Sequence, residues 1–151
     1  MSKTSYPLSH GQQAMWLLYQ IAPESVAYNI FITTKIHSSL DIAAFTLVWE
    51  KLVERHPILR TTYTIEDGQP VQQINKQQKF TVQVIDASGW DEYYLHEQIY
   101  ATPDQPYNLE ADWVFRVNLF TISAKEHILF LGMHHIAGDL WSFDLLLNEF
   151  Q

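Results

Sequence analysis

Four stretches of the chain place apolar residues at the spacing of one helical face. They are residues 9–21, 41–56, 90–101 and a final stretch that holds Phe143, Leu146, Leu147 and Phe150. In the stretch 41–56 the apolar positions form a broad stripe, which is typical of a helix packed on a core. The spacing predicts four helices, and the periodicity is weakest in the third.

Capping residues and prolines mark the limits of the first two predicted helices. Ser9 can accept the first free N–H of its helix, and Gln12 three residues later completes a capping-box pattern. Asp41 is a good N-cap for the second helix. Pro23 and Pro57 end the two helices, because proline disfavours helical backbone in the preceding residue.

Six further stretches are rich in β-branched or alternating apolar residues and predict strands. They are residues 28–37, 59–66, 70–74, 80–85, 114–122 and 127–134. Asp67-Gly68 predicts a hairpin between two of them, residues 123–126 predict another, and 102–110 with its two prolines predicts a loop. Helices and hairpins alternate without a linker or repeat, so we expect one α/β (α+β) domain with a mixed sheet and flanking helices.

The composition supports a folded domain and excludes several classes of protein. The chain has 151 residues, of which 47% are hydrophobic, 14% aromatic and 17% charged, so it can bury a core and is not intrinsically disordered. No apolar run approaches the roughly 20 residues of a membrane span. The polar start, residues 1–7, lacks the apolar core of a signal peptide.

Charge and cysteine content narrow the partners further. Nine basic and seventeen acidic residues give a net charge of −8, and the basic residues are scattered. We therefore expect no nucleic-acid partner and no binding to anionic membranes. The chain has no cysteine, which excludes disulfides, thiolate metal sites and a cysteine nucleophile and fits a cytoplasmic protein.

One segment, MHHIAGDLWS at residues 133–142, concentrates side chains that can do chemistry. Adjacent residues of a strand point to opposite faces, so only one of His134 and His135 can face a cleft and act as a base. Asp139 follows Gly138, which permits a tight bend, and its carboxylate can orient a histidine or pair with an arginine. The alternative is a core histidine beside an aspartate that caps the last helix. A zinc site is disfavoured because the two rings diverge.

A second segment, residues 55–63, crosses from a helix end into a strand. Arg55 in the last helical turn suits the helix dipole. Arg60 begins a strand that we expect to be central. If Arg60 is buried it needs a carboxylate, and Asp139 is the candidate, whereas a solvated arginine at the strand end is the alternative.

Three segments together resemble a known family. Residues 8–16 (LSHGQQAMW), 55–61 (RHPILRT) and 133–139 (MHHIAGD) resemble the first three core motifs of condensation domains of nonribosomal peptide synthetases, the third being the HHxxxDG signature. The motifs occur in the family's order, and the resemblance extends over the whole chain. Three positions depart from the pattern: Ala14, Pro57, and Leu140, which replaces the glycine after Asp139.

The resemblance implies a fold similar to chloramphenicol acetyltransferase. A condensation domain has two such lobes in a V with the active site in a tunnel between them, and residues 1–151 resemble the N-terminal lobe, in part, with the C-terminal lobe absent. The implied partners are a donor and an acceptor carrier protein, which bring substrates on their own phosphopantetheine arms from opposite faces. The resemblance implies no intrinsic cofactor and no metal.

The resemblance also implies roles for individual residues. His135 deprotonates or positions the attacking α-amine against the donor thioester, and His134 is a buried support. Asp139 is structural and forms an ion pair with Arg60. The backbone N–H near Gly138 is a candidate stabiliser of the oxyanion.

Two alternatives to an amide-forming acyltransferase remain open. The lobe alone leaves half a tunnel, so it can be an inactive module that binds carrier proteins or another subunit. Its exposed apolar lobe interface then predicts self-association. The other alternative is a free-standing, single-lobe acetyltransferase that builds its site between the subunits of a trimer.

Overall fold

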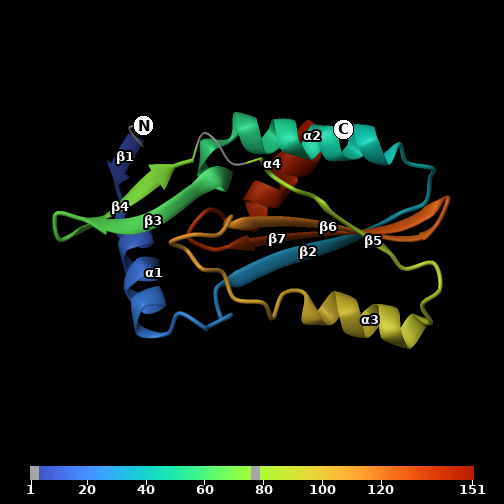
Figure 1. Ribbon diagram of the computed structural model, residues 1–151, viewed down its shortest axis with the longest axis horizontal. Coiled ribbons are helices and arrows are strands. Elements are labelled where there is room, and N and C mark those ends of the chain that lie inside the picture. Colours follow the sequence, from blue (N-terminus) through green and yellow to red (C-terminus); the bar gives the residue numbers. More distant parts are fainter. Residues whose placement is uncertain (1–3, 76–78) are drawn as a thin grey trace.

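A computed structural model describes residues 4–75 and 79–151. Outside these ranges lie the start of the polar segment 1–7 and two of the scattered basic residues, Lys3 and Lys76. Four helices, one short 3-10 helix and seven strands are described (Figure 1). In chain order they are β1 (Thr4–Pro7), α1 (His10–Ile21), β2 (Asn29–Ile36), α2 (Ile42–Arg55), η1 (Pro57–Arg60), β3 (Thr61–Glu66), β4 (Gln69–Ile74), β5 (Gln83–Asp86), α3 (Glu92–Ala101), β6 (Phe115–Ser123), β7 (Glu126–His134) and α4 (Leu140–Phe150).

The strands form two sheets. The larger has the order β2-β7-β6-β5 and is mixed, since β5 runs parallel to β6 while the other pairs are antiparallel. The smaller is antiparallel with the order β1-β4-β3. Helices α2 and α4 lie on one face of the larger sheet and α3 on the other (Figure 1). The predicted mixed sheet with flanking helices is confirmed.

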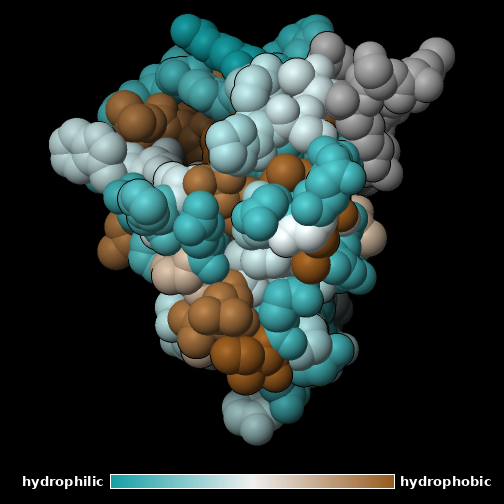
Figure 2. Space-filling model, turned by 90° about the vertical axis from the view of Figure 1, so that its left-hand side faces the viewer, coloured by the Kyte–Doolittle hydropathy of each residue, from teal (hydrophilic) through white to brown (hydrophobic). Residues whose placement is uncertain are grey.

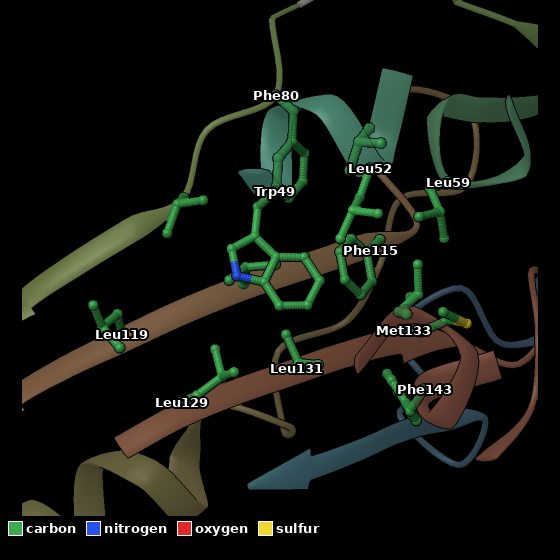
Figure 3. Packing of buried hydrophobic residues seen from close by; sticks show 14 of the residues in the cluster. Trp49, Leu52, Leu59, Phe80, Phe115, Leu119, Leu129, Leu131, Met133 and Phe143 are labelled. Atoms are coloured by element: carbon green, nitrogen blue, oxygen red, sulfur yellow. The ribbon is translucent and has the colours of Figure 1, made fainter. Parts of the chain in front are cut away.

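The alternation of side chains along β7 divides the core between these two faces. Leu129, Leu131 and Met133 pack with Trp49 of α2 and Phe143 of α4 in the main cluster (Figure 3). The alternate residues Ile128 and Phe130 point to the other face, where they pack against α3. Because both faces are covered, β7 is buried along nearly its whole length, and its final residue, His134, ends inside the protein.

The smaller sheet and α1 form a third cluster at one end of the molecule (Figure 1). Trp16 of α1 packs there with Tyr63 of β3 and with Ile136, which follows β7. The predicted capping box at Ser9 and Gln12 forms, so α1 begins where the sequence indicates. This cluster places the start of α1 beside the segment that contains the two histidines.

Most predicted elements are confirmed, and the differences have local causes. The Asp67-Gly68 turn forms with φ of 50° and 77°, the left-handed values that a tight hairpin of this kind requires. Residues 59 and 60 were expected in a strand but belong to η1, because Pro57 presets a helical φ at its first position. Arg60 therefore does not begin a central strand, and the strand after it, β3, is an edge strand.

The strand predicted at residues 80–85 is shorter. Phe80 and Val82 are buried as the alternation implies, but pairing with β6 starts only at Gln83. Strand β1 was not predicted, since four residues show too little alternation. In the described ranges, none of the helices is both long and apolar enough to cross a membrane.

Candidate functional site

His134 occupies the last position of β7 and is buried. Its Nδ1 accepts the backbone N–H of Ile136 at 3.1 Å. The rings of Tyr107 and Tyr28 lie 6.1 Å and 6.4 Å from it between centroids. Burial, with a smaller contribution from neighbouring His135, lowers the pKa of His134 to about 4. The ring is therefore neutral at pH 7, with its hydrogen on Nε2.

His135 points the opposite way and is exposed, as the strand alternation predicts. Its backbone N–H donates to the carbonyl oxygen of Tyr28 at 2.8 Å. This bond extends the pairing between β7 and β2 by one residue. Its Nδ1 lies 2.6 Å from the carbonyl oxygen of Gly138. A carbonyl oxygen only accepts, so Nδ1 carries the hydrogen of the neutral ring. The lone pair is then on Nε2, the state a general base needs.

Two open hollows meet at this residue. One, of about 570 Å³, is lined by Asn29, Ile30, Phe31, His135, Asp139, Leu140 and Trp141. The other, of about 430 Å³, is lined by Ser9, Gly11, Gln12, Met15, Ile58 and residues 135–139. His135 and Asp139 contribute to both hollows. An exposed imidazole thus stands on the rim between two spaces that can each receive a group of a substrate.

Asp139 caps helix α4. Its Oδ1 accepts the backbone N–H and the hydroxyl of Ser142, both at 3.1 Å. The Ser142 hydroxyl oxygen in turn accepts the N–H of Asp139. This is the alternative left open for Asp139 in the sequence, and it is the arrangement that forms.

The predicted ion pair between Asp139 and Arg60 is wrong. Within the described ranges Asp139 has no ion pair, and Arg60 donates instead to the carbonyl oxygens of Asn75 at 2.9 Å and Glu54 at 3.3 Å. The cause is η1, which turns Arg60 toward the last turn of α2 and the end of β4. Arg60 therefore links the end of α2 to the end of β4. Asp139 caps α4, the helix that it precedes.

Gly138 is required by close packing. A Cβ at this position would lie 2.6 Å from the Ser142 hydroxyl oxygen and 2.8 Å from the sulfur of Met133. Its carbonyl oxygen holds His135, while the role of its N–H in oxyanion stabilisation stays a prediction.

Leu140, which departs from the family pattern, is the first residue of α4, is 61% exposed and lines the larger hollow.

Three contributors to the site were not recognised in the sequence. Asn29 lies opposite His134 in the sheet register and lines a hollow. Gln12, identified only as a cap, also donates to the carbonyl oxygen of Ile136 at 3.4 Å. Tyr107 packs on His134 from a loop. Of these three residues, Gln12 had a sequence signal because it falls in the motif segment 8–16, whereas Asn29 and Tyr107 lie outside the three motif segments.

The fold and site define an α/β lobe that presents an exposed histidine, His135, directly after a buried strand. Within the described residues, groups of three or more histidine, aspartate or glutamate side chains that could hold a metal are not found. The chain belongs to the condensation domain family, whose model matches residues 2–151. The resemblance to the N-terminal lobe of these domains is confirmed.

Relatives and solved structures agree with this membership. The chain is 36% identical to bacitracin synthase 3 of Bacillus licheniformis and 31% identical to tyrocidine synthase 3 of Brevibacillus parabrevis. The matches cover 97% and 95% of this chain but only 2% of each relative. The starter condensation domain of rhizomide synthetase RzmA has the same fold, with a TM-score of 0.89 and 24% identity over 97% of this chain and 36% of that chain.

Proposed function

We propose that this chain is the N-terminal lobe of an amide-forming condensation domain of a nonribosomal peptide synthetase. The observation that carries the proposal is the exposed Nε2 of His135, whose lone pair is left free by the bond from Nδ1 to Gly138. Membership of the condensation domain family supports the reaction class.

The proposed reaction transfers an acyl group from a thioester to an amine. The α-amine of the acceptor attacks the thioester carbonyl, a C–N bond forms and the C–S bond breaks. The amine proton passes to the thiolate that leaves, either by way of Nε2 of His135 or directly while Nε2 orients the amine. The backbone N–H of Gly138 is the proposed donor to the transient oxyanion.

We further propose that the substrates arrive on a donor and an acceptor carrier protein and that the chain has no cofactor of its own. The two hollows on either side of His135 support two separate approaches. The chain spans 36% of the solved domain that it resembles, so residues 1–151 are proposed to act together with a second lobe that closes the tunnel. A chain without cysteine whose substrates are carrier-bound fits the cytoplasm.

A second candidate is a binding module that contacts carrier proteins or another subunit without catalysis. Helix α1 supports it, because Leu17 and Ile21 are 61% and 72% exposed. Such apolar side chains are available for a partner surface or for self-association.

Replacement of His135 tests the proposal. In the complete condensation domain that contains this chain, we expect His135→Ala to slow amide formation by about 10²–10⁴-fold, the usual contribution of a positioned base. The melting temperature should change little because the ring is exposed. The measurement is product formed from an acyl donor carrier and an aminoacyl acceptor carrier.

His37→Ala is the matched control, since His37 is also exposed but directly follows the end of β2 that is farthest from His135. Amide formation by His135→Ala at the unsubstituted rate would refute the catalytic role. Carrier binding without any amide product from the unsubstituted domain would favour the binding module.

A further inference from the structure

A loop outside the three motif segments packs directly on His134. Residues 102–114 connect α3 to β6, and Tyr107 in this loop is buried. Its ring meets the His134 ring edge-on, with centroids 6.1 Å apart and an interplanar angle of 84°. The contact therefore depends on how the loop is held under the end of β7.

The strands on both sides of β7 hold this loop. Arg116 of β6 donates to the carbonyl oxygens of Gln105 at 2.8 Å and Pro106 at 2.7 Å, and its guanidinium carbon lies 3.7 Å from the centre of the Tyr107 ring. From β2, the Nδ2 of Asn29 donates to Gln105 as well, at 3.0 Å, and to Pro103 at 2.8 Å.

The sheet register places these contacts around His134. Asn29 is paired with His134, and Arg116 is paired with Gly132. Because the sheet order is β2-β7-β6, the loop is bound at two strands and passes across the third between them. At Gly132 a Cβ would lie 3.2 Å from the Tyr107 hydroxyl and 2.7 Å from the Phe130 ring. Because Gly132 has no side chain, it leaves the space that the Tyr107 hydroxyl occupies.

The state of His134 matters for its neighbour. His134 Nδ1 accepts the N–H of Ile136, and its carbonyl oxygen accepts the N–H of Ala137. These bonds fix the turn that holds His135. A proton on Nδ1 of His134 would replace an acceptor with a donor, and the bond from Ile136 would be lost.

We propose that Tyr107, clamped by Arg116 and Asn29, is a positioning residue that holds the buried His134 ring against the N–H of Ile136 and thereby fixes the turn that presents His135. Tyr107 does not reach the hollows and acts only through His134. The consequence for turnover rests on the proposed function, but the positioning itself is a property of the chain alone.

The test follows the two histidines by NMR in the full 151-residue chain, with ring nitrogens labelled. The unsubstituted chain and Tyr107→Phe, which keeps the ring, should titrate His134 near its pKa of about 4. Tyr107→Leu should move this titration toward the ordinary value of 6.5 and reduce the share of His135 that carries its hydrogen on Nδ1. Tyr100→Leu on the exposed face of α3 is the control.

A second variant keeps the test decisive if Tyr107→Leu does not fold. Arg116→Met retains the Tyr107 ring but removes both bonds to the loop, and it should shift both histidines in the same direction. Unchanged titration of His134 and an unchanged hydrogen position on His135 in a folded variant would overturn the proposal.

Activity separates this proposal from the proposed function. In the complete domain, Tyr107→Leu should lower kcat more than about tenfold with KM nearly unchanged, and Tyr107→Phe should restore it. If His135→Ala retains full activity while the NMR shifts occur, the proposed function fails and the positioning stands.

Discussion

At the scale of single residues, two adjacent histidines acquire opposite properties from the direction in which each side chain leaves the strand. His134 turns into the protein, loses its water and stays neutral. His135 turns out to solvent and keeps an accessible Nε2. The divergence follows from the two-residue period of a strand and was predictable. The position of the hydrogen on His135 was not, because it depends on the backbone path that brings the Gly138 carbonyl oxygen to Nδ1.

A third histidine offers a test of core energetics. His127 on β7 is 2% exposed, and neither ring nitrogen has a hydrogen-bond partner in the described chain. Thr121, its cross-strand neighbour, has an unpartnered buried hydroxyl as well. Unpaired buried polar groups cost about 1–3 kcal/mol each. We expect His127→Leu to raise the free energy of unfolding by roughly this amount, measured by urea denaturation.

The control for His127→Leu is His37→Leu, in which an exposed imidazole is replaced and the free energy of unfolding should barely change. A less stable His127→Leu protein would mean that the imidazole is satisfied in solution.

At the scale of elements, helix α4 shows how a local cap can replace an expected long-range contact. The sequence allowed Asp139 to be either an N-cap or the partner of Arg60, and spacing alone could not separate the two. The outcome depends on η1, a short 3-10 turn that begins at Pro57 and redirects Arg60. The four long helices were predictable from their apolar period, which the caps of the first two support, whereas a four-residue turn leaves no periodic signal.

The cap of α4 gives a prediction of defined size. Asp139→Ala should lower the free energy of unfolding by about 1 kcal/mol, the usual cost of losing an N-cap, rather than the roughly 3–5 kcal/mol expected from breaking a buried ion pair. Asp139→Asn retains an acceptor oxygen and should be close to neutral. Thermal or urea unfolding of the two variants measures the difference.

Asp144→Ala, an exposed change within the same helix, is the comparison for the Asp139 variants. A loss of several kcal/mol in Asp139→Ala but not in Asp144→Ala would restore an ionic role for Asp139.

At the scale of the whole molecule, helix α1 carries one of the apolar patches of the surface. Figure 2 shows a hydrophobic patch in the lower part of the end face, where α1 lies, and the exposed apolar residues of this helix are Leu17, Leu18 and Ile21. The helix contains no aspartate, glutamate, lysine or arginine.

The family and the general layout could be predicted from the order of three motifs. The loop under β7 could not, since its role depends on contacts between residues distant in sequence.

The patch on α1 predicts concentration-dependent self-association of this chain. Leu17→Gln combined with Ile21→Gln should keep the chain monomeric at concentrations where the unsubstituted chain forms dimers, as measured by sedimentation velocity. Tyr93→Gln with Tyr100→Gln, which changes exposed side chains of α3, should leave association intact. Identical sedimentation of all three proteins would exclude α1 as the contact.

The turn from His134 to Gly138 carries one consequence for energetics. Its hydrogen bonds join groups of the chain itself and hold the ring of His135 in one orientation. For the proposed base His135, the entropy cost of orienting the ring is therefore incurred on folding and not at each turnover. A substitution that loosens this turn should therefore leave the affinity for substrates unchanged. It should lower the fraction of bound substrates that react.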